Sequence, residues 1–130
     1  MNIPKDLLYS NSHEWVKFVD DNTVLMGLDD YAQHALSDLV FVTMPSVGDE
    51  VTVGEPFGNI ESVKAVADIF SQVTGVVAEV NEEVDKSPQL INQNPYDSWI
   101  IKVNNITEKA ELMDAAEYEK YCTELDKEEE

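Results

Sequence analysis

The sequence contains no arginine and a single cysteine, and these two scarcities exclude several classes of protein. All 8 cationic side chains are lysines, against 27 aspartates and glutamates, so the formal net charge is −19. Phosphate backbones and anionic head groups are bound mainly through lysine and arginine, so this balance argues against nucleic acid and membrane partners. Cys122 alone cannot form an internal disulfide, and the composition therefore does not indicate an exported, disulfide-stapled domain.

Long apolar runs and targeting segments are also missing. No apolar stretch approaches the roughly 18 residues of a membrane-spanning helix, and residues 1–6 resemble neither a signal peptide nor an arginine-rich transit peptide. We therefore expect a soluble cytoplasmic protein, or one of the mitochondrial matrix if a eukaryotic presequence has been removed. The 130 residues are enough for one domain, which we expect to span 1–130 with a core over about 8–125 and an acidic tail at 126–130 that frays. Electrostatic repulsion between two copies of so acidic a chain favours a monomer.

The sequence has none of the familiar patterns for independent catalysis or metal binding. His13 and His34 are not spaced as paired metal ligands, and there is no CxxC, HExxH or glycine-rich phosphate loop. Neither histidine has a serine or cysteine nearby in a nucleophile motif. We therefore expect no metal site and no catalytic residues, so that any chemistry would reside on an attached group.

Short β-rich segments separated by turn residues fill most of the chain. Segments 15–19 and 23–27 flank a polar turn and predict an N-terminal hairpin. The same alternation of β-rich segments and turn residues predicts strands at 40–44, 51–53, 57–63, 66–70, 75–81 and 98–104. A proline-bearing loop is predicted at 87–95. Strands this short and evenly spaced favour a small sandwich or barrel.

Two helices are predicted beside these strands. Asp29 can cap a short helix whose apolar stripe would consist of Ala32, Ala35, Leu36 and Leu39. Asp114 and Glu117 have the form of a capping box and predict a C-terminal helix. The apolar stripe of that helix would consist of Ala115, Tyr118, Cys122 and Leu125.

One lysine lies between two of the predicted strands. Lys64 stands in Glu61-Ser62-Val63-Lys64-Ala65, at the expected tip of a hairpin. An exposed lysine on a flexible stem can be acylated without disturbing a core, so it suits covalent attachment better than a buried catalytic base. Taken alone, an ordinary solubility residue is the simpler interpretation, and the surrounding residues decide against it.

The segment around Lys64, together with Ala67-Asp68 and the run 75–81, resembles the lipoylation segment of the H-protein family of the glycine cleavage system. The resemblance extends over most of the chain. It includes residues 12–15, 31–33, 40–42, 45, 48, 87–88, 90–92, 94–96 and 99. Three departures stand out: Ser37 replaces a usual glycine, Gln72 replaces a usual proline, and Leu28-Asp29 replaces Ile-Thr.

The resemblance implies a mainly β, lipoyl-domain-like barrel-sandwich hybrid of short antiparallel strands, with an N-terminal hairpin, a short helix and a C-terminal helix. It implies that lipoate is joined to Lys64 by an amide. The turn that presents this lysine would be formed by Glu61, Ser62, Val63 and Ala65. It also implies a surface cleft, formed by Ser12, Glu14 and Asp68. This cleft would hold the cationic amine of the aminomethyl group that the lipoyl arm carries.

The function that the resemblance implies is that of a non-catalytic carrier. Such a carrier shuttles the aminomethyl group of glycine from a pyridoxal-phosphate decarboxylase (P protein) to a tetrahydrofolate-dependent aminomethyltransferase (T protein). Dihydrolipoyl dehydrogenase (L protein) reoxidises it, and a lipoyl-attaching enzyme modifies it. Two alternatives stay open: an H-like relay that donates lipoyl groups to other enzymes, and an unmodified acidic interaction module.

Overall fold

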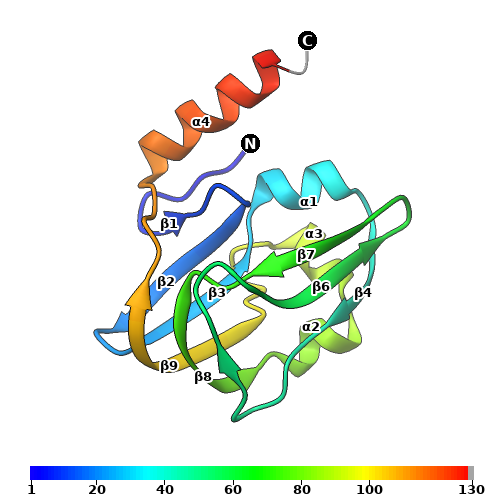
Figure 1. Ribbon diagram of the computed structural model, residues 1–130. Helices are drawn as coiled ribbons and strands as arrows, with labels where there is room; N and C mark the ends of the chain where they lie inside the picture. The colour runs from blue at the N-terminus through cyan, green and yellow to red at the C-terminus, as the bar shows by residue number, and fades with distance from the viewer. Residues whose placement is uncertain (129–130) are drawn as a thin grey trace.

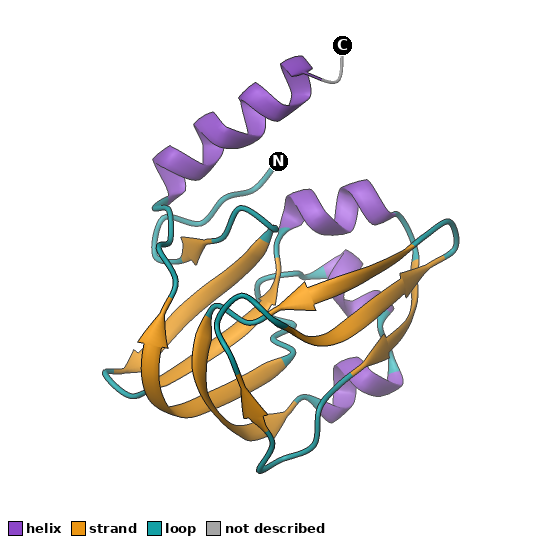
Figure 2. Ribbon diagram, viewed as in Figure 1, coloured by secondary structure: helices purple, strands orange, loops and turns teal. Residues whose placement is uncertain are grey.

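The computed structural model describes residues 1–128 and arranges their strands in two antiparallel sheets (Figure 1 and Figure 2). The larger sheet has the order β1-β2-β3-β9-β8-β5, and the smaller has the order β4-β6-β7. The strands are β1 (Leu8–Tyr9), β2 (Glu14–Asp20), β3 (Thr23–Leu28), β4 (Leu39–Thr43), β5 (Glu50–Val51), β6 (Pro56–Ser62), β7 (Val66–Phe70), β8 (Val73–Val80) and β9 (Ile101–Lys109). The mainly β architecture predicted from the strand rhythm is confirmed.

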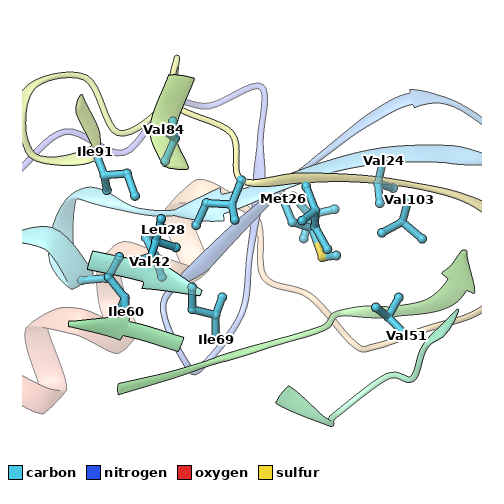
Figure 3. Packing of buried hydrophobic residues seen from close by; sticks show 14 of the residues in the cluster. Val24, Met26, Leu28, Val42, Val51, Ile60, Ile69, Val84, Ile91 and Val103 are labelled. Carbon is cyan, nitrogen blue, oxygen red and sulfur yellow. The ribbon is translucent and has the colours of Figure 1, made fainter. Parts of the chain in front are cut away.

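The main core lies between the two sheets, and its side chains come from both of them (Figure 3). Met26 and Leu28 of β3 contribute from the larger sheet, while Ile60 and Ile69 of β6 and β7 contribute from the smaller one. Successive side chains of a strand point to opposite faces. In β7 this alternation buries Ile69 and leaves Val66 and Asp68 exposed, so the outer face of the smaller sheet is available to solvent.

Helix α1 (Asp30–Leu36) begins as predicted but ends earlier. The carboxylate of Asp29 accepts a hydrogen bond from the backbone N–H of Ala32 at 2.9 Å, which confirms the predicted cap. The predicted apolar stripe of this helix is wrong at two positions: Ala35 is exposed, and Leu39 belongs to β4. The helix ends because Ser37 adopts φ 71° and ψ −151°, a conformation that turns the chain out of the helix.

The segment after β8 differs most from the prediction. Residues 87–95 were expected to form a loop, yet α2 (Glu82–Lys86) and α3 (Gln89–Gln93) lie in or beside this segment. Helices of five residues are too short to display an apolar period in the sequence. The last strand was predicted at 98–104 but runs from Ile101 to Lys109. It extends further because Glu108 and Lys109 pair with Thr74 and Val73 of β8, and the hydroxyl of Ser98 donates to the carbonyl of Leu90 in α3.

The C-terminal helix α4 (Ala115–Glu128) rests on a second, smaller core. Its predicted capping box is confirmed in both directions: Asp114 accepts from the N–H of Glu117 at 2.8 Å, and Glu117 accepts from the N–H of Asp114 at 3.2 Å. The second core contains Leu7, Tyr9, Trp15, Ala115, Tyr118 and Cys122. The helix includes Asp126, where we expected the tail to fray, and residues 129–130 lie outside the described part of the chain. Across residues 1–128, no helix combines the length and apolar character needed to cross a membrane.

Candidate functional site

Lys64 lies at the exposed tip of the β6–β7 hairpin, which extends from the body of the molecule in Figure 1. The buried Ser62 organises this turn. Its hydroxyl accepts hydrogen bonds from the N–H groups of Lys64 at 3.3 Å and Ala65 at 3.1 Å, and it lies 3.3 Å from the Ala65 carbonyl, to which it donates. The backbone therefore holds the lysine in a fixed turn while its side chain projects into solvent.

The tip is also anchored from the side. The N–H of Val63 donates to the carbonyl of Asp38 at 3.0 Å, which ties the hairpin to the segment between α1 and β4. Asn92 of α3 fixes that segment in turn: it donates to the carbonyl of Ser37 at 2.8 Å and accepts from the N–H of Leu39 at 3.0 Å. Asn92 was noted in the sequence only as part of a family match, and its supporting contacts become visible only in the fold.

A second group of predicted residues meets at the other end of β7. Glu14 is fully buried, and its Oε1 accepts hydrogen bonds from Ser10 Oγ at 2.6 Å, from Ser12 Oγ, and from Gln72 Nε2 at 2.9 Å. Its Oε2 accepts from the N–H of Phe70 at 3.2 Å. The structure thus brings Ser12 and Glu14 together, and it adds Ser10 and Gln72, whose contacts with Glu14 the sequence did not indicate.

The burial of Glu14 determines its electrostatics. Removal from water disfavours a charged carboxylate and raises the pKa of Glu14, while the donors from Ser10, Ser12 and the backbone act in the opposite direction. The balance leaves the pKa above its usual value. A negative charge at this position is therefore kept by specific hydrogen bonds and not by solvent.

A surface cleft of about 690 Å³ opens beside this carboxylate. Ser12, Phe70 and Gln72, three of the residues that donate hydrogen bonds to Glu14, also line it. The other lining residues are Asn11, Val53, Gly54, Ala110, Glu111, Leu112, Met113, Glu117 and Tyr121. Among the described residues, the cleft lining includes acidic side chains and no lysine, so the cleft favours a cation.

Asp68 lies between the lysine turn and the cleft. It is exposed on β7, and within residues 1–128 its carboxylate makes no hydrogen bond or ion pair. It shares the outer face of β7 with Val66 and Phe70, because residues two apart on a strand point the same way. This face connects the hairpin tip, through Asp68, to the cleft at Phe70.

The sequence matches a family model described as "Glycine cleavage H-protein" over residues 7–125. A glycine cleavage system H protein of Lachnoclostridium phytofermentans is 50% identical over 121 residues, which cover 93% of this chain and 95% of the relative. The corresponding protein of Carboxydothermus hydrogenoformans is 50% identical over 125 residues, covering 94% and 95%.

The fold shows the same relationship. The solved structure of a glycine cleavage system H protein from Mycobacterium marinum matches this chain with a TM-score of 0.86 at 35% identity. The match covers 94% of this chain and 98% of that one. The resemblance noted at the lysine segment is confirmed over nearly the full length, and the chain belongs to the glycine cleavage H-protein family, the lipoyl carriers of the glycine cleavage system.

Proposed function

We propose that this protein carries lipoate on the Nζ atom of Lys64 and delivers the aminomethyl group of glycine between the enzymes of the glycine cleavage system. The observation that supports the proposal most directly is the hairpin tip. There Ser62 holds the backbone of an exposed lysine in a fixed turn. A modifying enzyme can engage such a turn without unfolding any part of the domain, and Glu61, Val63 and Ala65 complete the surface that it would recognise.

The residues around the tip fit a long acyl group. Lipoate supplies a reducible ring disulfide, which takes up a one-carbon unit together with electrons. Acylation removes the charge of Lys64, and Val66, which lies 64% exposed beside the turn, offers an apolar surface to the alkyl chain. A strand rises about 3.3 Å per residue, so Asp68 lies roughly 7 Å along β7 from Val66, the first strand residue after the turn. An acylated lysine arm is longer than this span and can pass Asp68.

The cleft is proposed to receive the cargo end of the arm. Its acidic lining attracts the amine of the aminomethyl group, which is cationic at neutral pH, and Ser12 offers a hydroxyl for a charge-assisted hydrogen bond. Glu14 is buried beneath the lining residues, and its negative charge attracts the amine without contacting it. Asp68 would attract the amine as the arm passes along β7. Sequestering the amine in this way keeps it from water between enzymes.

The chain itself is proposed to act as a carrier and not as a catalyst. Its partners would be the P, T and L proteins and a lipoyl-attaching enzyme. A net charge of −19 steers the carrier toward basic docking faces and gives contacts that weaken with salt, which suits a carrier that must leave each enzyme. The same charge favours a monomer.

The proposal is tested by the intact mass of the protein purified from lipoate-replete cells, followed by peptide mapping. We expect a lipoyl adduct on Lys64 and none on the Lys64→Arg variant. The matched control is Lys86→Arg, an exposed lysine outside the hairpin, which should be modified like the wild type. An unmodified Lys64 would favour the acidic interaction module.

A functional assay separates glycine cleavage from lipoyl relay. Lipoylated protein is mixed with the P, T and L proteins, glycine, tetrahydrofolate and NAD⁺, and NADH formation is followed. We expect turnover with the wild type and with Lys86→Arg, and none with Lys64→Arg. A lipoylated protein that supports no turnover, yet donates its lipoyl group to another apoprotein, would favour the relay.

A further inference from the structure

The side chain of Gln72 lines the cleft and also contacts the buried carboxylate of Glu14. Gln72 directly precedes β8 and lines the cleft, whereas Glu14 is fully buried and does not. The amide nitrogen of Gln72 makes two hydrogen bonds, to Glu14 Oε1 at 2.9 Å and to the carbonyl of Phe70 at 3.1 Å. A cation in the cleft therefore contacts lining residues such as Gln72 and Ser12 before it can reach the carboxylate.

These two hydrogen bonds determine how the amide is oriented. A primary amide nitrogen has two hydrogens, and both acceptors beside it are oxygens that cannot donate. The amide oxygen consequently points away from Glu14. This oxygen has no hydrogen-bond partner among residues 1–128. In that part of the chain the only side-chain oxygen or nitrogen that is both buried and without a partner belongs to Asp29, so the Gln72 oxygen is not a buried atom. The Gln72 oxygen is thus accessible to solvent, and the cleft is the solvent space that Gln72 lines.

We propose that the amide oxygen of Gln72 accepts a hydrogen bond from the cationic amine of the cargo, so that Gln72 is a cargo-binding residue through which Glu14 acts. This inference rests on the proposed function and concerns the same cleft. The amide places its N–H end on the carboxylate and its C=O end toward the cleft. The buried charge therefore polarises the amide and strengthens the acceptor that the cargo meets.

The arrangement divides two roles between two residues. Glu14 supplies the negative charge but is excluded from solvent, and its carboxylate accepts hydrogen bonds from Ser10, the Phe70 N–H and Gln72. Gln72 and Ser12 supply the neutral oxygens that contact the amine.

The test uses two substitutions that both remove the acceptor. Gln72→Met keeps the side-chain length and removes both the donor and the acceptor without adding charge. Gln72→Lys keeps a donor for Glu14, removes the acceptor and adds a positive charge. The matched control is Gln93→Met, an exposed glutamine of α3. Each protein is lipoylated, loaded with glycine by the P protein, and separated from it; the lifetime of the loaded form at neutral pH is then measured.

We expect Gln72→Met to release the cargo roughly ten to a hundred times faster than the wild type, because one charge-assisted hydrogen bond is lost. Gln72→Lys should be at least as fast, because its added charge also repels the amine. Gln93→Met should match the wild type. If Gln72→Met kept the wild-type lifetime, the amide oxygen would not bind the cargo and the inference would be overturned. A wild type that is neither lipoylated nor loaded would instead overturn the proposed function, so the two failures are distinguishable.

A second measurement uses only the wild type and does not depend on how a variant folds. The side-chain carbonyl carbon and amide nitrogen of Gln72 are followed by NMR before and after loading, with Gln93 as the internal reference. We expect both Gln72 signals to shift on loading while those of Gln93 stay in place. Unshifted Gln72 signals in a fully loaded sample would contradict the inference.

Discussion

Replacing Ser37 by glycine should stabilise the protein. Ser37 ends α1 with φ 71° and ψ −151°, a conformation that is essentially restricted to glycine. Its side chain is exposed and makes no hydrogen bond within the described residues, although its backbone N–H donates to the carbonyl of Gln33 and its own carbonyl accepts from Asn92. The Ser37→Gly variant therefore loses no contact.

The size of the effect follows from two opposing terms. A non-glycine residue in this conformation costs about 1–3 kcal/mol. Glycine offsets part of the gain, because it loses about 0.5–1 kcal/mol more in conformational entropy on folding. We expect a net gain of about 1 kcal/mol in the free energy of unfolding, or a rise of roughly 3–5 °C in the thermal midpoint for a chain of this size.

Urea titration at neutral pH, followed by tryptophan fluorescence, measures this difference. The matched control is Ser46→Gly, an exposed loop serine with a negative φ, which should lose stability by about 0.5–1 kcal/mol because only the entropy term applies. If Ser37→Gly were as destabilising as Ser46→Gly, Ser37 would not be strained and the reasoning would be refuted. A faster rate of lipoylation is not expected, because the contacts that hold the hairpin tip are unchanged.

Three further substitutions test other parts of the fold. Burial raises the pKa of Asp29 from 3.8 to about 7, so the folded state retains a proton that the unfolded state has lost, and wild-type stability should fall as the pH rises from about 4 to 7. Asp29→Asn keeps the helix cap, should flatten this dependence, and should gain about 1–3 kcal/mol at pH 8 in urea titrations; an unchanged slope would contradict the assignment. Ser62→Ala removes the acceptor for two N–H groups of the turn and should cost about 1 kcal/mol while slowing lipoylation in a timed mass assay, whereas a wild-type rate would mean that the turn does not depend on the hydroxyl. Gly58→Ala would place a Cβ 2.1 Å from the carbonyl of Thr43 and should lose about 3 kcal/mol or more as β4 separates from β6, and a thermal midpoint within 2–3 °C of the wild type would refute that.

Local patterns predicted the elements whose signals are contained within a few neighbouring residues. The cap at Asp29, the capping box of Asp114 and Glu117, and the turn that presents Lys64 each depend on contacts over three residues or fewer. The strands of the main core were found because alternation and turn residues mark them locally. Helices α2 and α3 were missed because one or two turns of helix carry no readable period and their stability comes from tertiary packing.

The sequence by itself determined the class of fold, the family, and the lysine at the tip of a hairpin, since each depends on short segments or on residue identities along the chain. The composition likewise determined an acidic protein without arginine. Only the tertiary structure decided what surrounds Glu14, because Ser10 and Gln72 are separated by about sixty positions and meet only when β2 and β7 come together. The orientation of the Gln72 amide was decided there too, since a side chain takes its hydrogen-bond partners from whichever strands the fold places beside it.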